Sequence, residues 1–370
     1  MRHNWEYKKL GDVCDKGSSN ISLNKIEDNT GKYALFGASG YVKGIDFYHN
    51  ETPYIGIVKD GSGCGRVNIY PAKSSLVGTM QYIYPKPNCN LKFLMYLLQK
   101  MDLSSLVSGS AIPHIYFKDY SKYIIPVPPL STQQSIVSEL DTLSGIIAEC
   151  KETLKDYDAL EQSIFYDMFG DPVKNEKGWE VKKLGECFKV TSSKRIYMEE
   201  LTDCGIPFLK VADINNLINE KCTPTSFISN DKYQELKSNG HVPSPNDLLV
   251  TARGTIGKVY IIQENDAFYF QDGMITWLKQ GRYKIEPKYI KDLFQVPNFL
   301  EYLGQFSNNS TVAFLSIAKL ATVNIPIPPL PLQQSFATKI EAIEQMKAET
   351  REALQEAETL LQARMDYWFN

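Results

Sequence analysis

The sequence has no long apolar run and no secretory leader. Apolar residues make up 43% of the chain, but no stretch approaches the roughly 20 consecutive apolar residues of a membrane-spanning helix. The N-terminal segment MRHNWEYKKL also lacks the apolar core of a signal peptide. We therefore expect a protein of the cytoplasm.

Cysteine and histidine lack the spacing of disulfide frameworks or metal sites. The seven cysteines include no C-x-x-C pair, and the four histidines are dispersed. An odd number of cysteines without ligand spacing indicates free thiols in a reducing compartment. No structural metal is expected.

Catalytic motifs are also missing. There is no [Asp/Asn]-Pro-Pro-[Tyr/Phe] loop or Phe-x-Gly-x-Gly donor site of a methyltransferase, no His-Glu-x-x-His and no Gly-x-Ser-x-Gly. The segment GSGCGR at residues 61–66 lacks the Gly-Lys-[Ser/Thr] ending of a P-loop, which argues against nucleotide binding. We expect no enzymatic activity in this chain.

What the sequence does contain is an internal duplication. PVPPLSTQQSIVSEL at residues 126–140 returns as PIPPLPLQQSFATKI at 326–340, and LEQSIFYDMF at 160–169 returns as LLQARMDYWF at 360–369. Both offsets are 200 residues, so no insertion separates the copies. A packed helix tolerates no insertion, because one added residue turns its apolar stripe by about 100°. The copies are therefore predicted to be long helices.

Apolar residues in both copies follow the steps of three and four that form a helix seam. A proline-rich run precedes each helix and fixes its start. A seam of about 33 residues would span roughly 50 Å, too long for a core helix of a domain this size, so the two helices are predicted to pack on each other. Glu161 interrupts the first seam, and Lys347, Thr350 and Arg364 interrupt the second. The predicted seam residues are Ile136, Leu140, Leu143, Ile147, Leu154 and Ile164 in the first helix, and Phe336, Ile340, Ile343, Leu354 and Leu361 in the second.

A lobe with strand-like patterning precedes each helix. WEYKKLGDVC at residues 5–14 returns as WEVKKLGEC at 179–187, so the two lobes begin alike. Short β-leaning runs alternate with glycine-rich turns, and each lobe adds a helical segment, which indicates an α+β fold. The predicted domains are lobes at residues 1–130 and 171–330 and long helices at 131–170 and 331–370.

Charge is unevenly distributed over these segments, although the net charge is only −3. Basic residues exceed acidic ones by five in the first lobe and by one in the second, whereas acidic residues exceed basic ones by six and three in the helices. A bound polyanion would therefore contact the lobes. The acidic helix residues predicted to face solvent or a partner are Glu139, Glu149, Glu152, Glu341, Glu344 and Glu352.

Together these features resemble the specificity subunit of type I restriction-modification systems. The resemblance covers essentially the whole chain and rests on Trp-Glu-x-x-Lys-Leu-Gly-[Asp/Glu] opening each lobe, Pro-Pro-Leu-x-x-Gln-Gln closing it, and the GDP linker at residues 170–172. It implies a non-catalytic subunit whose two target recognition domains each recognise one half of a bipartite double-stranded DNA target. Two antiparallel helices, in a pseudo-two-fold arrangement, would set the spacing and dock two methyltransferase subunits. Restriction and translocase subunits would join the complex, and S-adenosylmethionine, ATP and Mg²⁺ would belong to the partners.

The candidate DNA contacts lie in two small-residue turns and in the segments that lead into the helices. GSGCGR in the first lobe corresponds in place to TARGTIGKV at residues 251–259 in the second. Glycine allows close approach of the backbone and arginine binds guanine or phosphate, although a solvated β-turn is the alternative interpretation. The candidates are Lys59, Ser62, Arg66, Ser108, Ser110, His114 and Lys118 in the first lobe, and Arg253, Thr255, Lys258, Asn308, Ser310 and Thr311 in the second.

Three questions stay open in the sequence. The tyrosine- and phenylalanine-rich stretches around Tyr116, Tyr120, Tyr123 and residues 269–270 would either stack on bases or pack in a core, and core packing is the simpler interpretation. A protein-binding scaffold without DNA is a second function, which salt-dependent DNA affinity would exclude. A fragment of a fused modification enzyme is a third, which methyl transfer by the isolated chain would establish.

Overall fold

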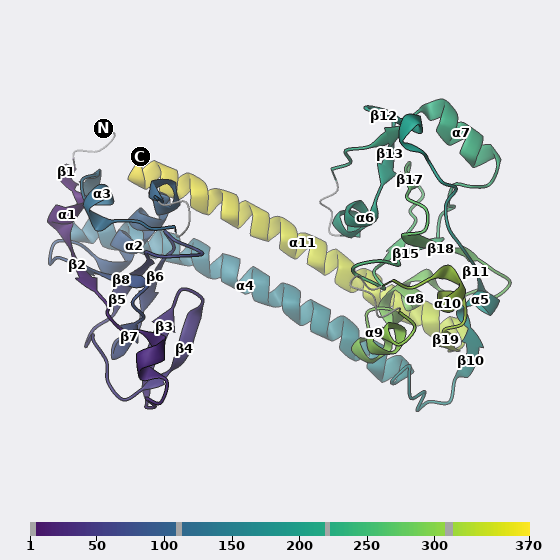
Figure 1. The fold of residues 1–370 in the computed structure, drawn as a ribbon, viewed down its shortest axis with the longest axis horizontal. Coiled ribbons are helices and arrows are strands. Elements are labelled where there is room, and N and C mark those ends of the chain that lie inside the picture. Colours follow the sequence, from purple (N-terminus) through teal and green to yellow (C-terminus); the bar gives the residue numbers. More distant parts are fainter. Residues whose placement is uncertain (1–4, 109–112, 219–222, 308–313) are drawn as a thin grey trace. The chain divides into compact units, whose positions relative to one another are not determined.

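The computed structural model describes residues 5–108, 113–218, 223–307 and 314–370, and its elements are labelled in Figure 1. The chain divides into two compact units. The first contains Met1–Glu152 and Arg351–Asn370, and the second contains Thr153–Thr350. Each unit therefore holds one lobe and part of both long helices. Among the described residues, no helix has the length and apolar character of a membrane span.

The first lobe is built on a four-stranded antiparallel sheet in the order β2-β8-β5-β6. The central strand β5 is buried along its whole length, since both faces of the sheet are covered. Helix α2 covers one face, and it begins where the Asn90 side chain accepts hydrogen bonds from the backbone N–H groups of Lys92 and Phe93. The elements are β2 (Cys14–Ser18), β8 (Met80–Pro85), β5 (Tyr54–Val58), β6 (Val67–Tyr70) and α2 (Leu91–Lys100).

Two smaller strand groups complete this lobe. A three-stranded sheet has the order β4-β3-β7, and β1 pairs antiparallel with β9, which ties the start of the lobe to its end. Short helical turns connect these strands. The elements are β1 (Glu6–Lys9), α1 (Leu10–Val13), η1 (Leu23–Ile26), β3 (Tyr33–Gly37), β4 (Gly40–Ile45), β7 (Ser74–Leu76), η2 (Leu103–Leu106), α3 (Phe117–Tyr120) and β9 (Ile124–Val127).

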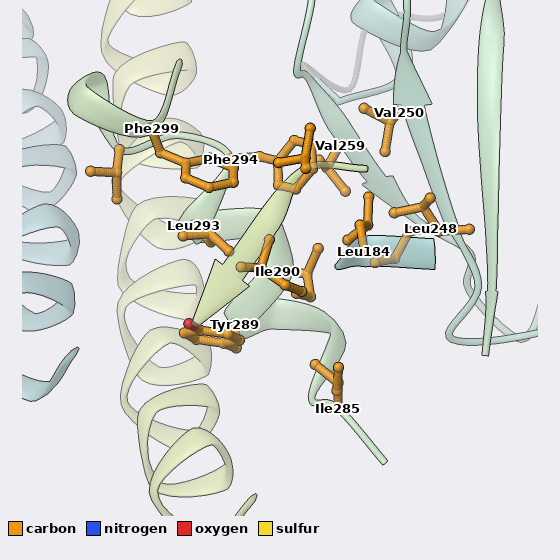
Figure 2. Close-up of a cluster of buried hydrophobic side chains, with 14 of the residues drawn as sticks. Leu184, Leu248, Val250, Val259, Ile285, Tyr289, Ile290, Leu293, Phe294 and Phe299 are labelled. Atoms are coloured by element: carbon orange, nitrogen blue, oxygen red, sulfur yellow. The ribbon is translucent and has the colours of Figure 1, made fainter. Parts of the chain in front are cut away.

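The second lobe repeats this plan with sheet order β11-β18-β15-β16 and a β10-β19 pair. Figure 2 shows its core, where side chains of β15 and α8 point into one apolar cluster. A second sheet, β12-β14-β13-β17, corresponds to the β4-β3-β7 sheet of the first lobe, since in both one strand lies between an antiparallel and a parallel partner, and β12 adds a fourth strand. The principal elements are β10 (Glu180–Lys183), β11 (Phe188–Thr191), β15 (Leu248–Thr251), β16 (Val259–Ile261), β18 (Ile275–Gln280), α8 (Pro287–Leu293), α9 (Pro297–Gly304) and β19 (Asn324–Ile327). The others are α5 (Leu184–Cys187), η3 (Met198–Glu200), β12 (Leu201–Thr202), β13 (Ile206–Leu209), α6 (Val211–Ile218), β14 (Phe227–Ile228), α7 (Asn230–Ser238), β17 (Tyr269–Phe270) and α10 (Ile317–Ala321).

The long helices are α4 (Leu130–Phe169) and α11 (Leu330–Phe369), each of 40 residues. A buried glutamine at the fourth position of each helix explains the repeated Pro-Pro-Leu-x-x-Gln-Gln motif. Gln133 donates to the Pro128 carbonyl oxygen at 2.8 Å and accepts from the Asn90 N–H at 2.7 Å. Gln333 donates to the Pro328 carbonyl oxygen at 2.7 Å and accepts from the Glu286 N–H at 2.9 Å. The motif thus joins each long helix to the start of a helix in its own lobe.

The two long helices run antiparallel, because the beginning of one meets the end of the other in both units. In the first unit, Glu139 of α4 accepts hydrogen bonds from Arg364 and Trp368 of α11. The hydrogen bond from Arg364 lowers the pKa of the Glu139 carboxyl group. In the second unit, the Lys347 ammonium group of α11 lies 2.6 Å from carboxylate oxygens of both Asp158 and Glu161 of α4. The charged interruptions of the two predicted seams therefore pair with residues of the opposite helix, whereas the Thr350 hydroxyl group donates to the Met346 carbonyl oxygen of its own helix.

The seam residues are buried most deeply near the lobes. Ile164 is half-buried, while its neighbours Phe165 and Phe169 are buried because they contact Phe336 and Tyr289 of the second unit's core. Ala357, which the sequence pattern also places in the second seam, is buried, whereas Phe165, Phe169 and Met365 are buried residues that the pattern did not place there. Of the predicted seam, Ile136, Leu140, Leu143, Phe336, Ile340 and Ile343 are buried, and Ile147, Leu154, Ile164, Leu354 and Leu361 are half-buried.

Two of the acidic residues predicted to face solvent or a partner were misassigned. The Glu139 carboxylate accepts hydrogen bonds from Arg364 and Trp368 of α11. Glu344 pairs with Lys288 and Lys291 of α8, the latter at 2.6 Å, because α8 packs its basic side against α11. Glu149, Glu152, Glu341 and Glu352 are exposed.

Candidate nucleic-acid interface

The two glycine-rich turns connect equivalent strands. Residues 59–66 join β5 to β6, and residues 252–258 join β15 to β16. In the first turn the Gly65 N–H donates to the Val58 carbonyl oxygen at 2.8 Å, and in the second the Gly257 N–H donates to that of Thr251 at 3.0 Å. The predicted correspondence of GSGCGR with TARGTIGKV is thereby confirmed. We call these segments the first and second recognition loops.

Each recognition loop also pairs with the segment that leads into the long helix. The Lys59 carbonyl oxygen accepts from the Ile115 N–H at 3.0 Å, and the Ala252 carbonyl oxygen accepts from the Leu315 N–H at 2.9 Å. Bridges also connect Asp60 with His114 and Arg253 with Phe314. Both lobes therefore present their candidate residues on one shared backbone frame with different side chains.

In the first lobe, the predicted residues gather around Asp60, which the prediction omitted, and Tyr116, which it named as a possible stacking residue. The Asp60 carboxylate pairs with Nδ1 of His114 and lies 3.6 Å from the Lys59 ammonium group. The His114 ring lies 4.0 Å from that of Tyr116, and Lys118 lies 5.0 Å above the same ring. The cluster thus combines cations, an acceptor and an exposed aromatic ring.

The remaining candidates of the first lobe lie along its loop. Arg66 is exposed, and its guanidinium group folds back to the carbonyl oxygens of Ser62 and Gly63, both at 3.4 Å. Ser108 exchanges backbone hydrogen bonds of 2.9 Å with His114, which places it beside the cluster. Ser110 lies outside the described residues.

In the second lobe the candidates separate into exposed and inward-facing groups. Arg253 is exposed and contacts the Met274 sulfur at 3.6 Å. The exposed Thr255 offers its carbonyl oxygen to the Thr251 hydroxyl group. Lys258 donates to the Gln295 side chain at 3.0 Å and so braces the loop against α8 and the turn after it. Asn308, Ser310 and Thr311 lie outside the described residues.

A pocket of about 310 Å³ opens beside Arg253. Lys210 and Gln271 line it, and sequence reasoning missed both. They directly follow strands β13 and β17, whose parallel pairing has no local signal in the sequence. The pocket places two further polar side chains next to the second recognition loop.

The aromatic residues mostly confirm core packing. Tyr120, Tyr269 and Phe270 are buried, whereas Tyr116 and Tyr123 are exposed. Of the aromatic residues predicted as possible stacking partners, Tyr116 is the one that belongs to the first lobe's cluster.

The described cysteines are free thiols. Burial raises the pKa of Cys14 and of Cys89 to about 12, so both stay protonated at neutral pH. Among the described residues, no group of three or more histidine, cysteine and acidic side chains is arranged to hold a metal ion.

Replacing Gly65 with alanine is expected to lower the free energy of unfolding by about 2–4 kcal/mol. Gly65 has φ +94°, and an added Cβ would lie 2.6 Å from the Ser104 backbone nitrogen. Gly61 is the matched control, because its φ is +80° but an added Cβ would meet nothing within 4 Å. Denaturant unfolding of the full chain should show a loss of only about 1 kcal/mol for Gly61→Ala. Equal losses for the two variants would mean that close packing does not anchor the loop.

The chain has two related lobes, and each carries a recognition loop with its own polar side chains. This arrangement defines a protein with two recognition domains. The family model for the type I restriction modification DNA specificity domain matches residues 2–156 and 176–359. The chain therefore belongs to the family of type I restriction-modification specificity subunits, and its role is DNA specificity.

Relatives and solved structures match over nearly the whole chain. A putative type I restriction enzyme specificity subunit of Haemophilus influenzae is 25% identical over 347 residues, covering 92% of this chain and 87% of the relative. The MjaVIII specificity subunit of Methanocaldococcus jannaschii is 23% identical, covering 95% and 90%. The crystal structure of an S subunit from M. genitalium matches with TM-score 0.64 at 16% identity, covering 100% of this chain and 97% of that one. A chain from a study of complex assembly in the type I R-M system matches with TM-score 0.56 at 18% identity, covering 98% and 96%.

Proposed function

We propose that each lobe recognises one half of a bipartite DNA target through its recognition loop and the segment paired with it. The observation that carries this proposal is the shared backbone frame with unlike side chains. Asp60 with His114 in one lobe corresponds to Arg253 with Phe314 in the other. Two lobes of this kind would bind two half-sites in the same orientation while recognising different base sequences.

The candidate contacts divide by chemistry. Lys59, Arg66 and Lys118 would bind phosphate or guanine in one half-site, and Arg253 would do so in the other. Lys258 is a weaker candidate than the sequence indicated, since Gln295 holds its ammonium group. Hydroxyl, amide and imidazole groups would add base-edge or backbone hydrogen bonds. The proposed residues of this kind are Ser62, Ser108, Ser110, His114, Thr255, Asn308, Ser310 and Thr311.

We further propose that catalysis belongs to partner subunits. The antiparallel helices would set the spacing between half-sites and dock two methyltransferase subunits, to which restriction and translocase subunits would add. S-adenosylmethionine, ATP and Mg²⁺ would be bound by those partners, and the complex would act in the cytoplasm. The exposed acidic residues of α4 and α11, Glu149 and Glu352 among them, are available for such docking.

Replacing Arg253 with alanine is expected to remove recognition of one half-site only. The target would first be defined by mapping methylated positions in the source genome with and without this gene. Binding of the chain with its modification subunits would then be measured on duplexes in which either half is scrambled. For Arg253→Ala, scrambling the half read by the second lobe should cost less than in the wild type, whereas scrambling the other half should cost as much as before. Losing one base contact would weaken binding of the intact target by about 1–3 kcal/mol.

Arg282→Ala is the matched control, because it removes an equal charge from an exposed arginine of the second lobe outside the recognition loop. It should preserve discrimination at both halves. An equal loss of discrimination at both halves in Arg253→Ala would contradict two independent heads. DNA affinity that does not fall with rising salt would contradict DNA binding through these cations.

A further inference from the structure

The pocket beside Arg253 has a polar rim and an apolar lining. Its polar side chains come from the second recognition loop, from the residue before α6 and from the residue after β17. Its apolar side chains come from the start of α6 and from the turn before β18. The polar residues are Arg253, Lys210 and Gln271, and the apolar ones are Val211, Ala212 and Met274.

The backbone holds these residues in fixed relative positions. Strands β13 and β17 pair in parallel with Leu209 opposite Phe270, and the Gln271 N–H donates to the Leu209 carbonyl oxygen at 2.9 Å. The Ala252 N–H donates to the Met274 carbonyl oxygen, also at 2.9 Å. This hydrogen bond fixes the second recognition loop next to the turn before β18, which carries Met274. Side chains carried by paired strand ends are placed more accurately than side chains on a free loop.

The cations of the pocket have no carboxylate partner within the described part of the chain. The acidic residues nearest in sequence to Lys210 and Gln271 make other contacts. The Asp213 carboxylate accepts from the backbone N–H of Lys210 at 2.9 Å, and that of Asp272 accepts from the Arg195 guanidinium group at 3.0 Å. Within the described residues, the one acceptor for the Arg253 guanidinium group is the Met274 sulfur at 3.6 Å, which is a weak acceptor. Its N–H groups are therefore available to a ligand.

We propose that this pocket receives the major-groove edge of DNA, with Arg253 binding O6 and N7 of a guanine and Gln271 binding N6 and N7 of a neighbouring adenine. Arginine and glutamine make these bidentate contacts because their donors and acceptors match those base edges. Lys210 binds a flanking phosphate, and Met274 contacts the methyl group of the thymine paired with that adenine. This inference rests on the proposed function and assigns the bases that the second lobe recognises.

The first lobe shows why this recognition is confined to one half-site. Asp60 occupies the position equivalent to Arg253, and its carboxylate is paired with His114. Thr79 occupies the position equivalent to Met274, since it accepts the corresponding loop N–H from Lys59 at 3.0 Å. The first lobe therefore has no guanidinium group at the position that Arg253 occupies in the second lobe.

The test is selection of bound duplexes from a randomised DNA pool by the full chain in complex with its modification subunits. The wild-type complex should enrich a two-part motif with a guanine next to an adenine in one half. Arg253→Lys should lower the preference for that guanine by about 5- to 150-fold, because lysine lacks the bidentate fork. Gln271→Ala should relax the neighbouring adenine alone by a similar factor. Lys210→Ala should weaken all sequences alike and reduce the slope of log affinity against log salt by about 1.

The outcomes separate this inference from the proposed function. If the wild-type complex enriches no two-part motif, both fail. If it enriches one and the preferences in both halves survive Arg253→Lys and Gln271→Ala, the pocket assignment is overturned while two-headed recognition stands. Arg282→Ala serves again as the control and should leave the motif unchanged. A loss of base preference confined to one half, at adjacent positions for the two variants, would support the assignment.

Discussion

Replacing Phe336 with alanine is expected to lower the free energy of unfolding of the second unit by about 3–5 kcal/mol. Phe336 is fully buried at the start of α11, and its ring lies 5.7 Å from that of Phe165 and 5.1 Å from that of Phe169. Truncation would leave a cavity where both long helices meet the core of the lobe. Denaturant unfolding combined with hydrogen exchange of the second unit's core strands would measure the loss.

Leu360→Ala is the matched control for this prediction. Leu360 lies on the same helix but is 49% exposed, so its truncation should change stability by no more than about 0.5 kcal/mol. Similar losses in both variants would show that general helix weakening, and not the aromatic cluster, accounts for the effect.

The wild-type second unit is expected to become less stable as the pH rises from about 4 to about 7. In Asp292→Asn this pH-dependent decrease in the free energy of unfolding is expected to be absent. Burial raises the pKa of Asp292 from 3.8 to about 7, although the attraction of Lys291 opposes this shift; repulsion from Glu161 and Glu344 adds to it. Its Oδ2 atom is buried and has no hydrogen-bond partner in the part of the chain that the structure describes. Between these two pH values the folded chain holds a proton that the unfolded chain has released. Folding therefore becomes less favourable as the pH rises, and above about pH 7 the full loss is present.

The size of this effect is about 2–4 kcal/mol between pH 4 and pH 8, taken as the difference between the variant and the wild type. Urea unfolding at a series of pH values would measure it. Asp203→Asn, at an exposed site of the same lobe, should follow the wild-type pH profile. An Asp292→Asn variant whose pH profile parallels that of the wild type would refute the role of this carboxyl group.

The helices and the order of the units were predictable because their signals are local and repeated. The two copies of Pro-Pro-Leu-x-x-Gln-Gln fixed where each helix begins, and Gln133 and Gln333 give the motif its physical reason. The pairing of Lys347 with Glu161 was not predictable. Each residue is a charged side chain that interrupts the apolar pattern of its own helix. That the two charges form a pair follows only from the register between the helices.

The candidate site was predictable in its loops and not in its neighbours. Glycine spacing located both recognition loops, but Asp60 and Tyr116 gain their place only when the segment around His114 folds back onto the loop. Lys210 and Gln271 reach the pocket through a parallel strand pair separated by about sixty residues of sequence. Contacts of that kind depend on the tertiary fold, which a single sequence does not specify locally.

The buried ammonium group of Lys347 also limits how the helices can slide. A shift by one turn, about 5.4 Å, would carry it away from Asp158 and Glu161 and strand an uncompensated charge in an apolar surrounding. Such a misaligned assembly would be disfavoured by several kcal/mol, as a single polar residue fixes alignment in coiled coils. In this unit the register of the helix pair is therefore fixed. The two helices cannot slide along each other in small steps to change the length of the pair.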